Sequence, residues 1–106
     1  MSFIAGNLFQ LPSASTGREV VETLLQSDAC RIERIESHGE SSPEDFWYDQ
    51  PEDEWVLLLK GAATLSFTDE EKIELKPGDY LLIPAHRKHR VERTSMDALW
   101  LAIHLT

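Results

Sequence analysis

The feature that most limits how this chain can fold is a series of short apolar or alternating runs, separated by turn residues, that begins at Arg31. Ala63, Leu65 and Phe67 alternate with polar residues, and the Lys-Pro-Gly-Asp segment at residues 76–79 is a strong turn signal. Turns that recur about every ten residues between such runs are typical of an all-β sandwich or barrel. The sequence therefore predicts an all-β domain over most of its length.

Two of the predicted strands carry more information than the others. In the strand of residues 99–105, one face is apolar and the other carries Trp100 and His104. The run from Trp55 to Leu59 is apolar on both faces, so something must cover its outer side. A second subunit there would make the protein a homodimer, and an N-terminal segment is the alternative. The other predicted strands are residues 31–37, 46–49, 63–67, 72–75 and 80–83, and the two-faced strand extends over residues 55–60.

The segment before these strands has two interpretations. Thr16 followed by Glu19 fits a capping box, and apolar residues then recur at helical spacing, so residues 17–26 are predicted to form a short amphipathic helix. The β-branched Val20 and Val21 fit an additional strand equally well.

A chain of 106 residues fits one domain, here an N-terminal arm of residues 1–29 packed on a β-domain of residues 30–106. The net charge of −9 argues against nucleic-acid binding, because the phosphates would be repelled. Cys30 has no disulfide partner, and the N-terminus lacks the pattern of a signal peptide, so we expect a cytoplasmic protein. No stretch is long and apolar enough to span a bilayer, so no membrane partner is expected.

Two spaced motifs lie in the second half of the chain. The first is Glu54, six further residues and Gly61, and the second is Gly78, five residues and Pro84, with His89 five residues later. They resemble the end of the first motif and the start of the second motif of the cupin family, which places a histidine at the position of His89. The order and separation of the motifs make the resemblance specific. It implies an all-β fold, a single cupin-type jelly-roll β-barrel with a short N-terminal helix or extra strand.

The sequence departs from the family pattern at the metal-binding positions. Trp47 and Asp49 stand where the family has two histidines, and His86 replaces a glycine. The resemblance then implies a divalent metal site built from the carboxylates and imidazoles that remain, which are Asp49, Glu54, His86 and His89. Such mixed ligands are compatible with Fe, Mn, Ni or Zn, and the sequence does not choose among these metals.

Two functions are open at this point. A bound metal would suit a small dioxygenase or isomerase that acts on an oxygenated substrate. The alternative is a non-catalytic small-molecule binding or sensing module without metal, in which Arg87, Arg90 or His86 neutralises an anionic ligand. The residues expected to contact a ligand are Trp47, Tyr48, Gln50, Arg90 and His104.

Each candidate side chain also has a purely structural interpretation. His89 would then be a hydrogen-bonded structural histidine, Asp49 a turn former and His86 a solvated loop residue. His104 lies inside a strand, where a core histidine with satisfied hydrogen bonds is the simpler expectation. A position inside a barrel is nevertheless where a functional histidine would lie.

Overall fold

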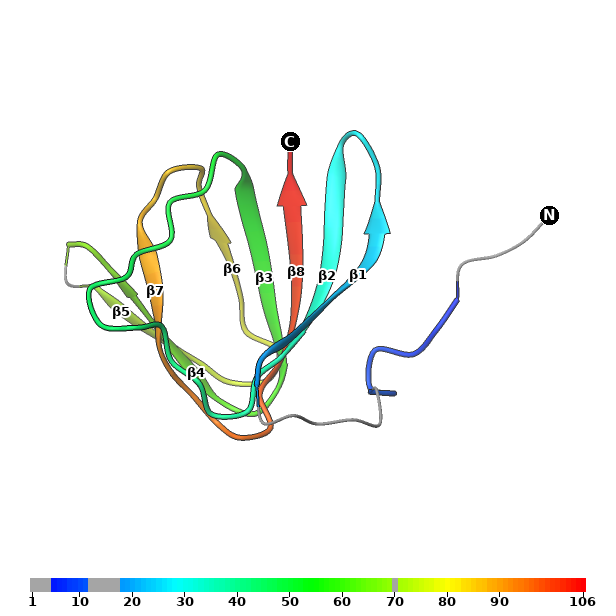
Figure 1. Cartoon of the computed structure of the whole chain (residues 1–106), viewed down its shortest axis with the longest axis horizontal. Helices are drawn as coiled ribbons and strands as arrows, with labels where there is room; N and C mark the ends of the chain where they lie inside the picture. The colour runs from blue at the N-terminus through cyan, green and yellow to red at the C-terminus, as the bar shows by residue number, and fades with distance from the viewer. Residues whose placement is uncertain (1–4, 12–17, 70) are drawn as a thin grey trace.

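The computed structural model describes residues 5–11, 18–69 and 71–106 of the chain. Eight strands form two antiparallel sheets (Figure 1). The larger sheet has the strand order β1-β2-β8-β3-β6, and the smaller has the order β5-β4-β7. The strands are β1 (Val20–Gln26), β2 (Cys30–Glu36), β3 (Asp53–Lys60), β4 (Ala63–Phe67), β5 (Lys72–Leu75), β6 (Tyr80–Ile83), β7 (His89–Thr94) and β8 (Leu99–Leu105).

The all-β prediction is confirmed, and the described residues contain no helix. The helix predicted over residues 17–26 is wrong, because Val20–Gln26 is strand β1 and pairs with β2. The alternative strand is the one that forms, as the β-branched Val20 and Val21 favour. Thr16, which suggested the helix cap, lies outside the described residues. In the described part of the chain, nothing helical is long and apolar enough to cross a membrane.

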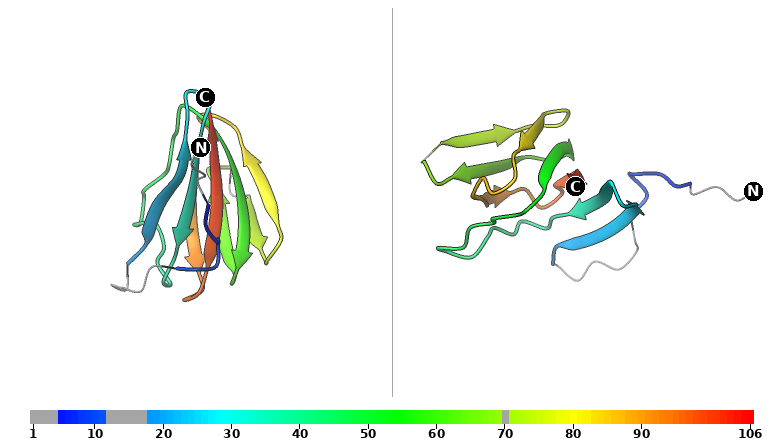
Figure 2. Two further views of the ribbon diagram at one scale, coloured as in Figure 1. Left: turned by 90° about the vertical axis from the view of Figure 1, so that its right-hand side faces the viewer. Right: turned by 90° about the horizontal axis from the view of Figure 1, so that it is seen from above.

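The two sheets lie on opposite sides of one apolar core, as the views of Figures 1 and 2 show. Leu58 and Trp100 of the larger sheet pack in this core with Leu65 and Phe67 of the smaller sheet. Over the described ranges no strand pairing joins the two sheets, so the closed part of the barrel prediction is not seen. What the structure has is a pair of antiparallel sheets with their apolar sides facing.

The connection between β2 and β3 runs along β7 at the edge of the smaller sheet (Figure 1). The Ser42 N–H donates to the Val91 carbonyl at 2.8 Å, and Tyr48 and His89 exchange backbone hydrogen bonds of 2.7 and 3.1 Å. The strand predicted over residues 46–49 is wrong, because this segment meets β7 at one isolated bridge rather than along a ladder. That bridge brings Tyr48 to the interior.

Strand β7 is missing from the predicted strands because its sequence is mostly polar. Within His-Arg-Val-Glu-Arg-Thr, the one large apolar residue is Val91. Glu92 and Arg93 are exposed on the outside of the sheet, while His89 is buried. A strand with many charged residues on its solvated face contains no apolar run, so the pattern of apolar residues does not predict it.

The turn from β3 to β4 depends on a glycine. Gly61 has φ of +83°, a backbone conformation that costs a residue with a side chain free energy. A Cβ added there would lie 2.4 Å from Ser95 Oγ and 2.8 Å from Ala98 Cα. The close approach of the β7–β8 turn therefore needs a glycine at this position.

Candidate functional site

An interior pocket lies between the two sheets and has a cavity volume of about 180 Å³. Its apolar wall consists of Val21, Ile35, Val56, Leu65, Ile83, Val91 and Trp100. Its polar lining consists of Glu19, Glu33, Tyr48, Gln50, Glu54, His89 and His104. The cavity is large enough for several water molecules or one small metabolite.

Strand register places two polar side chains together on the larger sheet. Glu54 on β3 is paired directly with His104 on β8. Because side chains of directly paired residues lie on the same face of a sheet, both project into the pocket. Both residues are buried, and His104 Nε2 lies 3.9 Å from Glu54 Oε2. The pair forms the polar part of an otherwise apolar wall.

His89 enters the pocket from the smaller sheet. Its Nδ1 lies 2.9 Å from the Arg87 carbonyl oxygen, which can only accept, so Nδ1 donates. In the neutral imidazole, Nε2 then carries the lone pair, and it lies 3.8 Å from Glu54 Oε1. The Tyr48 ring stacks on the imidazole at a centroid distance of 5.4 Å. The orientation of His89 is thus determined by its neighbours before any ligand binds.

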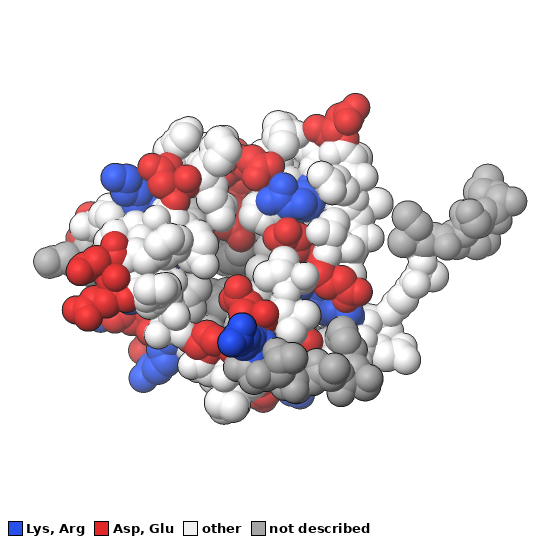
Figure 3. All heavy atoms as spheres, in the orientation of Figure 1, with Lys and Arg blue, Asp and Glu red and all other residues white. Residues whose placement is uncertain are grey.

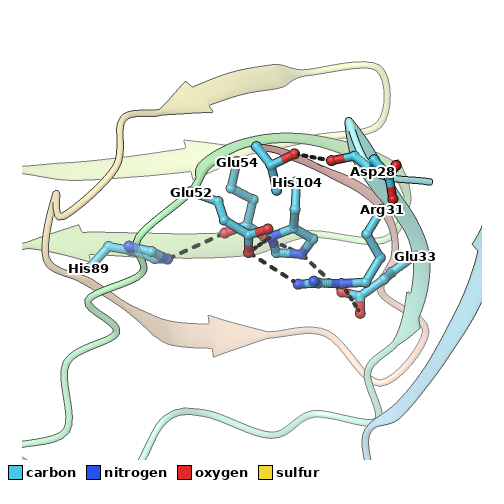
Figure 4. Close-up of polar contacts among 8 residues, drawn as sticks. Asp28, Arg31, Glu33, Glu52, Glu54, His89 and His104 are labelled. Carbon is cyan, nitrogen blue, oxygen red and sulfur yellow. Dashed lines mark hydrogen bonds and ion pairs between the residues drawn. The ribbon is translucent and has the colours of Figure 1, made fainter. Parts of the chain in front are cut away.

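A second set of contacts supports His104 (Figure 4). His104 Nε2 lies 2.9 Å from Glu33 Oε1, within hydrogen-bond distance. The Arg31 guanidinium in turn contacts Glu33 at 3.1 Å and Glu52 at 3.4 Å. Glu33 is therefore neutralised by Arg31 and held against His104.

Glu54 is the most unusual of these groups electrostatically. Burial raises the pKa of its carboxyl above the ordinary value, and the nearby imidazoles of His104 and His89 oppose that rise. The imidazole nitrogens at 3.8 and 3.9 Å are beyond hydrogen-bond distance from its oxygens. In Figure 4 the two histidines approach Glu54 from opposite sides, so the carboxyl lies between two possible proton carriers.

The four predicted metal ligands fall into two separate pairs. Glu54 and His89 face each other in the pocket, with side chains 9% and 7% exposed. His86 Nδ1 contacts Asp49 Oδ1 at 2.8 Å, but those side chains are 69% and 42% exposed. Within the described ranges, no three His, Cys, Asp or Glu side chains are placed to hold one metal ion. The residues do not fit the predicted four-ligand metal site.

The predicted ligand-contacting residues also divide. Tyr48, Gln50 and His104 line the pocket. Trp47 and Arg90 are not among its lining residues, and the Arg90 guanidinium lies 5.9 Å from the Trp47 ring centroid. Arg90 Nη2 also donates to the Ser42 carbonyl at 3.1 Å, so this cation stabilises the β2–β3 connection.

Two polar lining residues, Glu33 and Glu19, were not predicted. Alternation along residues 31–37 puts Arg31, Glu33 and Ile35 on one face, and this signal could have placed Glu33 inside. Glu19 precedes β1, and only the pairing of β1 with β2 brings it near the pocket. Burial raises the pKa of the Glu19 carboxyl, with a further contribution from Glu40.

Comparison with known proteins supports the resemblance seen in the motifs. The family model of the cupin domain matches residues 31–104. A provisionally named mannose-6-phosphate isomerase from Ralstonia eutropha JMP134 is 41% identical with a TM-score of 0.87, covering 95% of this chain and 96% of that chain. A cupin superfamily protein from Desulfitobacterium hafniense DCB-2 is 30% identical with a TM-score of 0.75, covering 89% and 83%.

More distant structures share the fold alone. KdgF from Halomonas sp. is 17% identical with a TM-score of 0.76, covering 98% of this chain and 94% of that chain. No match is found among the curated proteins.

Proposed function

This chain belongs to the cupin domain family, and from that premise we propose that its interior pocket binds a small organic molecule directly, without a metal ion between ligand and protein. The observation that carries the proposal is that Glu54 and His89, from opposite sheets, face each other in a cavity of about 180 Å³. Concave, mostly apolar sites with a few convergent polar groups are typical of small-molecule binding.

The positions of the candidate metal ligands support the metal-free form of this proposal. Asp49 and His86 contact each other on the surface, and this leaves Glu54 and His89 as the pair in the pocket. His104 is the nearest further imidazole, but its Nε2 is within hydrogen-bond distance of Glu33. This chain has Trp47 and Asp49 at the positions of the family's two histidines, and its cavity offers the remaining polar groups for contact with a ligand.

The name of one relative does not transfer directly to this pocket. Mannose 6-phosphate carries an anionic phosphate, and phosphate sites use Arg, Lys or clustered N–H donors. The described residues that line this pocket include no Lys or Arg. Arg87, one of the cations considered for an anionic ligand, contacts Asp69 at 3.0 Å instead. We therefore propose a ligand without a phosphate group.

A second candidate function is proton transfer to or from the bound molecule, as in an isomerase. Glu54 favours it, because burial raises the pKa of this carboxyl towards the range useful for general acid–base catalysis. His89 faces the same carboxyl and carries a lone pair on Nε2 in its neutral form. Glu54 would exchange a proton with the ligand, and His89 would orient it.

The test separates metal-dependent from metal-free binding. Protein purified without chelator is analysed for metals, then titrated with Fe(II), Mn(II), Ni(II) and Zn(II) by calorimetry. We expect no stoichiometric metal. A thermal-shift screen of small metabolites should find ligands whose effect persists in EDTA and is lost in His89→Ala. The matched control, His86→Ala, should keep the ligand response because His86 lies on the surface.

Stoichiometric metal that is lost in His89→Ala but kept in His86→Ala would overturn the metal-free proposal. Ligand responses that disappear in EDTA would do the same.

We also propose that two copies of the chain associate through the outer face of the larger sheet. Trp55 and Tyr80 lie on that face with ring centroids 5.5 Å apart. Tyr80 is 67% exposed and Leu82 is 51% exposed. Contiguous exposed apolar side chains of this kind are typical of protein interfaces.

A further inference from the structure

The charges around the pocket indicate the sign of the charge that its ligand carries. This inference rests on the function proposed above, that the pocket binds a small molecule. Three glutamates, Glu19, Glu33 and Glu54, line the cavity, and no Lys or Arg is found among its described lining residues. Figure 3 shows a hollow in this face of the molecule, with several Asp and Glu side chains and fewer Lys and Arg side chains around it. A lining with carboxylates and without Lys or Arg favours a cationic ligand over an anionic one.

The nearby cations are already used by other groups. Arg31 contacts Glu33 at 3.1 Å and Glu52 at 3.4 Å, so its ion pairs are with these two carboxylates and not with that of Glu54. Arg87 contacts Asp69 at 3.0 Å, and Arg90 donates to the Ser42 carbonyl at 3.1 Å. Glu54 therefore keeps a carboxyl without an Arg or Lys partner among the described residues.

A second observation points to a missing ligand group. The Glu54 side chain is 9% exposed, lines the cavity, and has its nearest imidazole nitrogens 3.8 and 3.9 Å away. His104 turns its Nε2 toward Glu33 at 2.9 Å and its Nδ1 toward Glu52 at 3.9 Å, so it gives the Glu54 carboxyl no hydrogen bond. Buried polar groups normally have hydrogen-bond partners, so a donor placed in the cavity would complete the hydrogen bonding of the Glu54 carboxyl.

The remaining wall suits the apolar body of such a ligand. Val56 and Trp100 line the same cavity as Glu54, and the Tyr48 ring stacks on His89 there. The indole N–H of Trp100 donates to Ser37 Oγ at 3.2 Å, so the polar edge of this ring already has a partner. Aromatic rings also attract organic cations through their faces.

We propose that the pocket binds a small organic amine in its protonated form, with the ammonium group donating to Glu54 and the carbon chain against the apolar wall. The expected ligand is one ammonium group on a short aliphatic or aromatic body, because the cavity of about 180 Å³ is small.

Three probes of similar size test the charge of the ligand. Isoamylamine, isoamyl alcohol and isovalerate share a branched carbon chain and differ in the head group, which is cationic, neutral or anionic. Calorimetric titration of the full chain at neutral pH and low ionic strength should give a dissociation constant for the amine at least tenfold lower than for the alcohol, and the weakest binding for the carboxylate. A charge-assisted hydrogen bond in a buried site is strong enough for a difference of about tenfold.

Two variants locate the site. Glu54→Gln should raise the dissociation constant of the amine at least tenfold and leave that of the alcohol nearly unchanged. Glu33→Gln should have a smaller effect on the amine, because Arg31 already neutralises Glu33. Glu74→Gln, on the exposed side of β5, should change nothing.

The amine proposal is overturned if the alcohol or the carboxylate binds as tightly as the amine, or if Glu54→Gln leaves amine binding unchanged. In the first case the pocket still binds small molecules, so the proposed function stands. Failure of all three probes overturns the amine proposal, and the metabolite screen then decides the proposed function separately.

Discussion

Replacing Glu54 by glutamine should stabilise the protein at neutral pH. The substitution keeps the shape of the side chain and removes the charge of a carboxyl whose pKa is raised, above all by burial. A carboxyl whose pKa is raised in the folded state contributes stability that is fully present below its unfolded-state pKa. This contribution is lost as the pH rises through the folded-state pKa. Wild type and Glu54→Gln should therefore be similar in stability below the ordinary carboxyl pKa of 4.5 and diverge above it.

The size of the effect follows from what the carboxylate contacts. The two imidazole nitrogens lie 3.8 and 3.9 Å away, so the change breaks no hydrogen bond to them. The amide remains a buried polar group, and its own desolvation offsets part of the gain. We expect a net increase in the free energy of unfolding on the order of 1 kcal/mol, which corresponds to about 4 to 8 °C in Tm for a domain near this size.

Thermal unfolding followed by circular dichroism at several values between about pH 4 and pH 8 measures the difference. Glu74→Gln is the control, because this exposed glutamate should show little change at any pH. A Glu54→Gln variant that is less stable than wild type at neutral pH, or a difference that does not vary with pH, would refute the reasoning. In the first case Glu54 would be a stabilising residue, and in the second its ionisation would not contribute to the difference.

Two further predictions concern the backbone and the outer face of the larger sheet. Gly61→Ala should lower the free energy of unfolding by about 1 to 2 kcal/mol or more, because of the positive φ and the contact with the Ala98 backbone. Chemical denaturation measures this free energy, and an unchanged midpoint would contradict the argument. Light scattering should find a dimer that Leu82→Lys converts to monomer, whereas Met96→Lys, at an exposed position in the β7–β8 turn, should remain dimeric. A wild-type monomer at all concentrations would contradict the dimer proposal.

The candidate site was only partly predictable. The motif spacing singled out Glu54 and His89, and the structure places them 3.8 Å apart between Nε2 and Oε1. The motif spacing did not show that Asp49 and His86 lie on the surface, away from the pocket, because both lie in loops whose path depends on tertiary contacts. Glu33 could have been placed inside by alternation along its strand, but its value as a partner of His104 depends on the pairing of β2 with β8.

The local sequence pattern was enough to predict the all-β class, most of the strands and the Lys-Pro-Gly-Asp turn, and to recognise the two motifs. Alternation and turn residues act over a few neighbouring positions. It was not enough for β1, where the propensities of Val20 and Val21 allowed two structures and pairing with β2 selected one. Nor was it enough for β7, whose polar sequence forms a strand because it pairs with β4. The pocket itself exists only when Glu54 and His104 on neighbouring strands meet His89 from the opposite sheet, since residues far apart in sequence become neighbours through strand register and sheet packing.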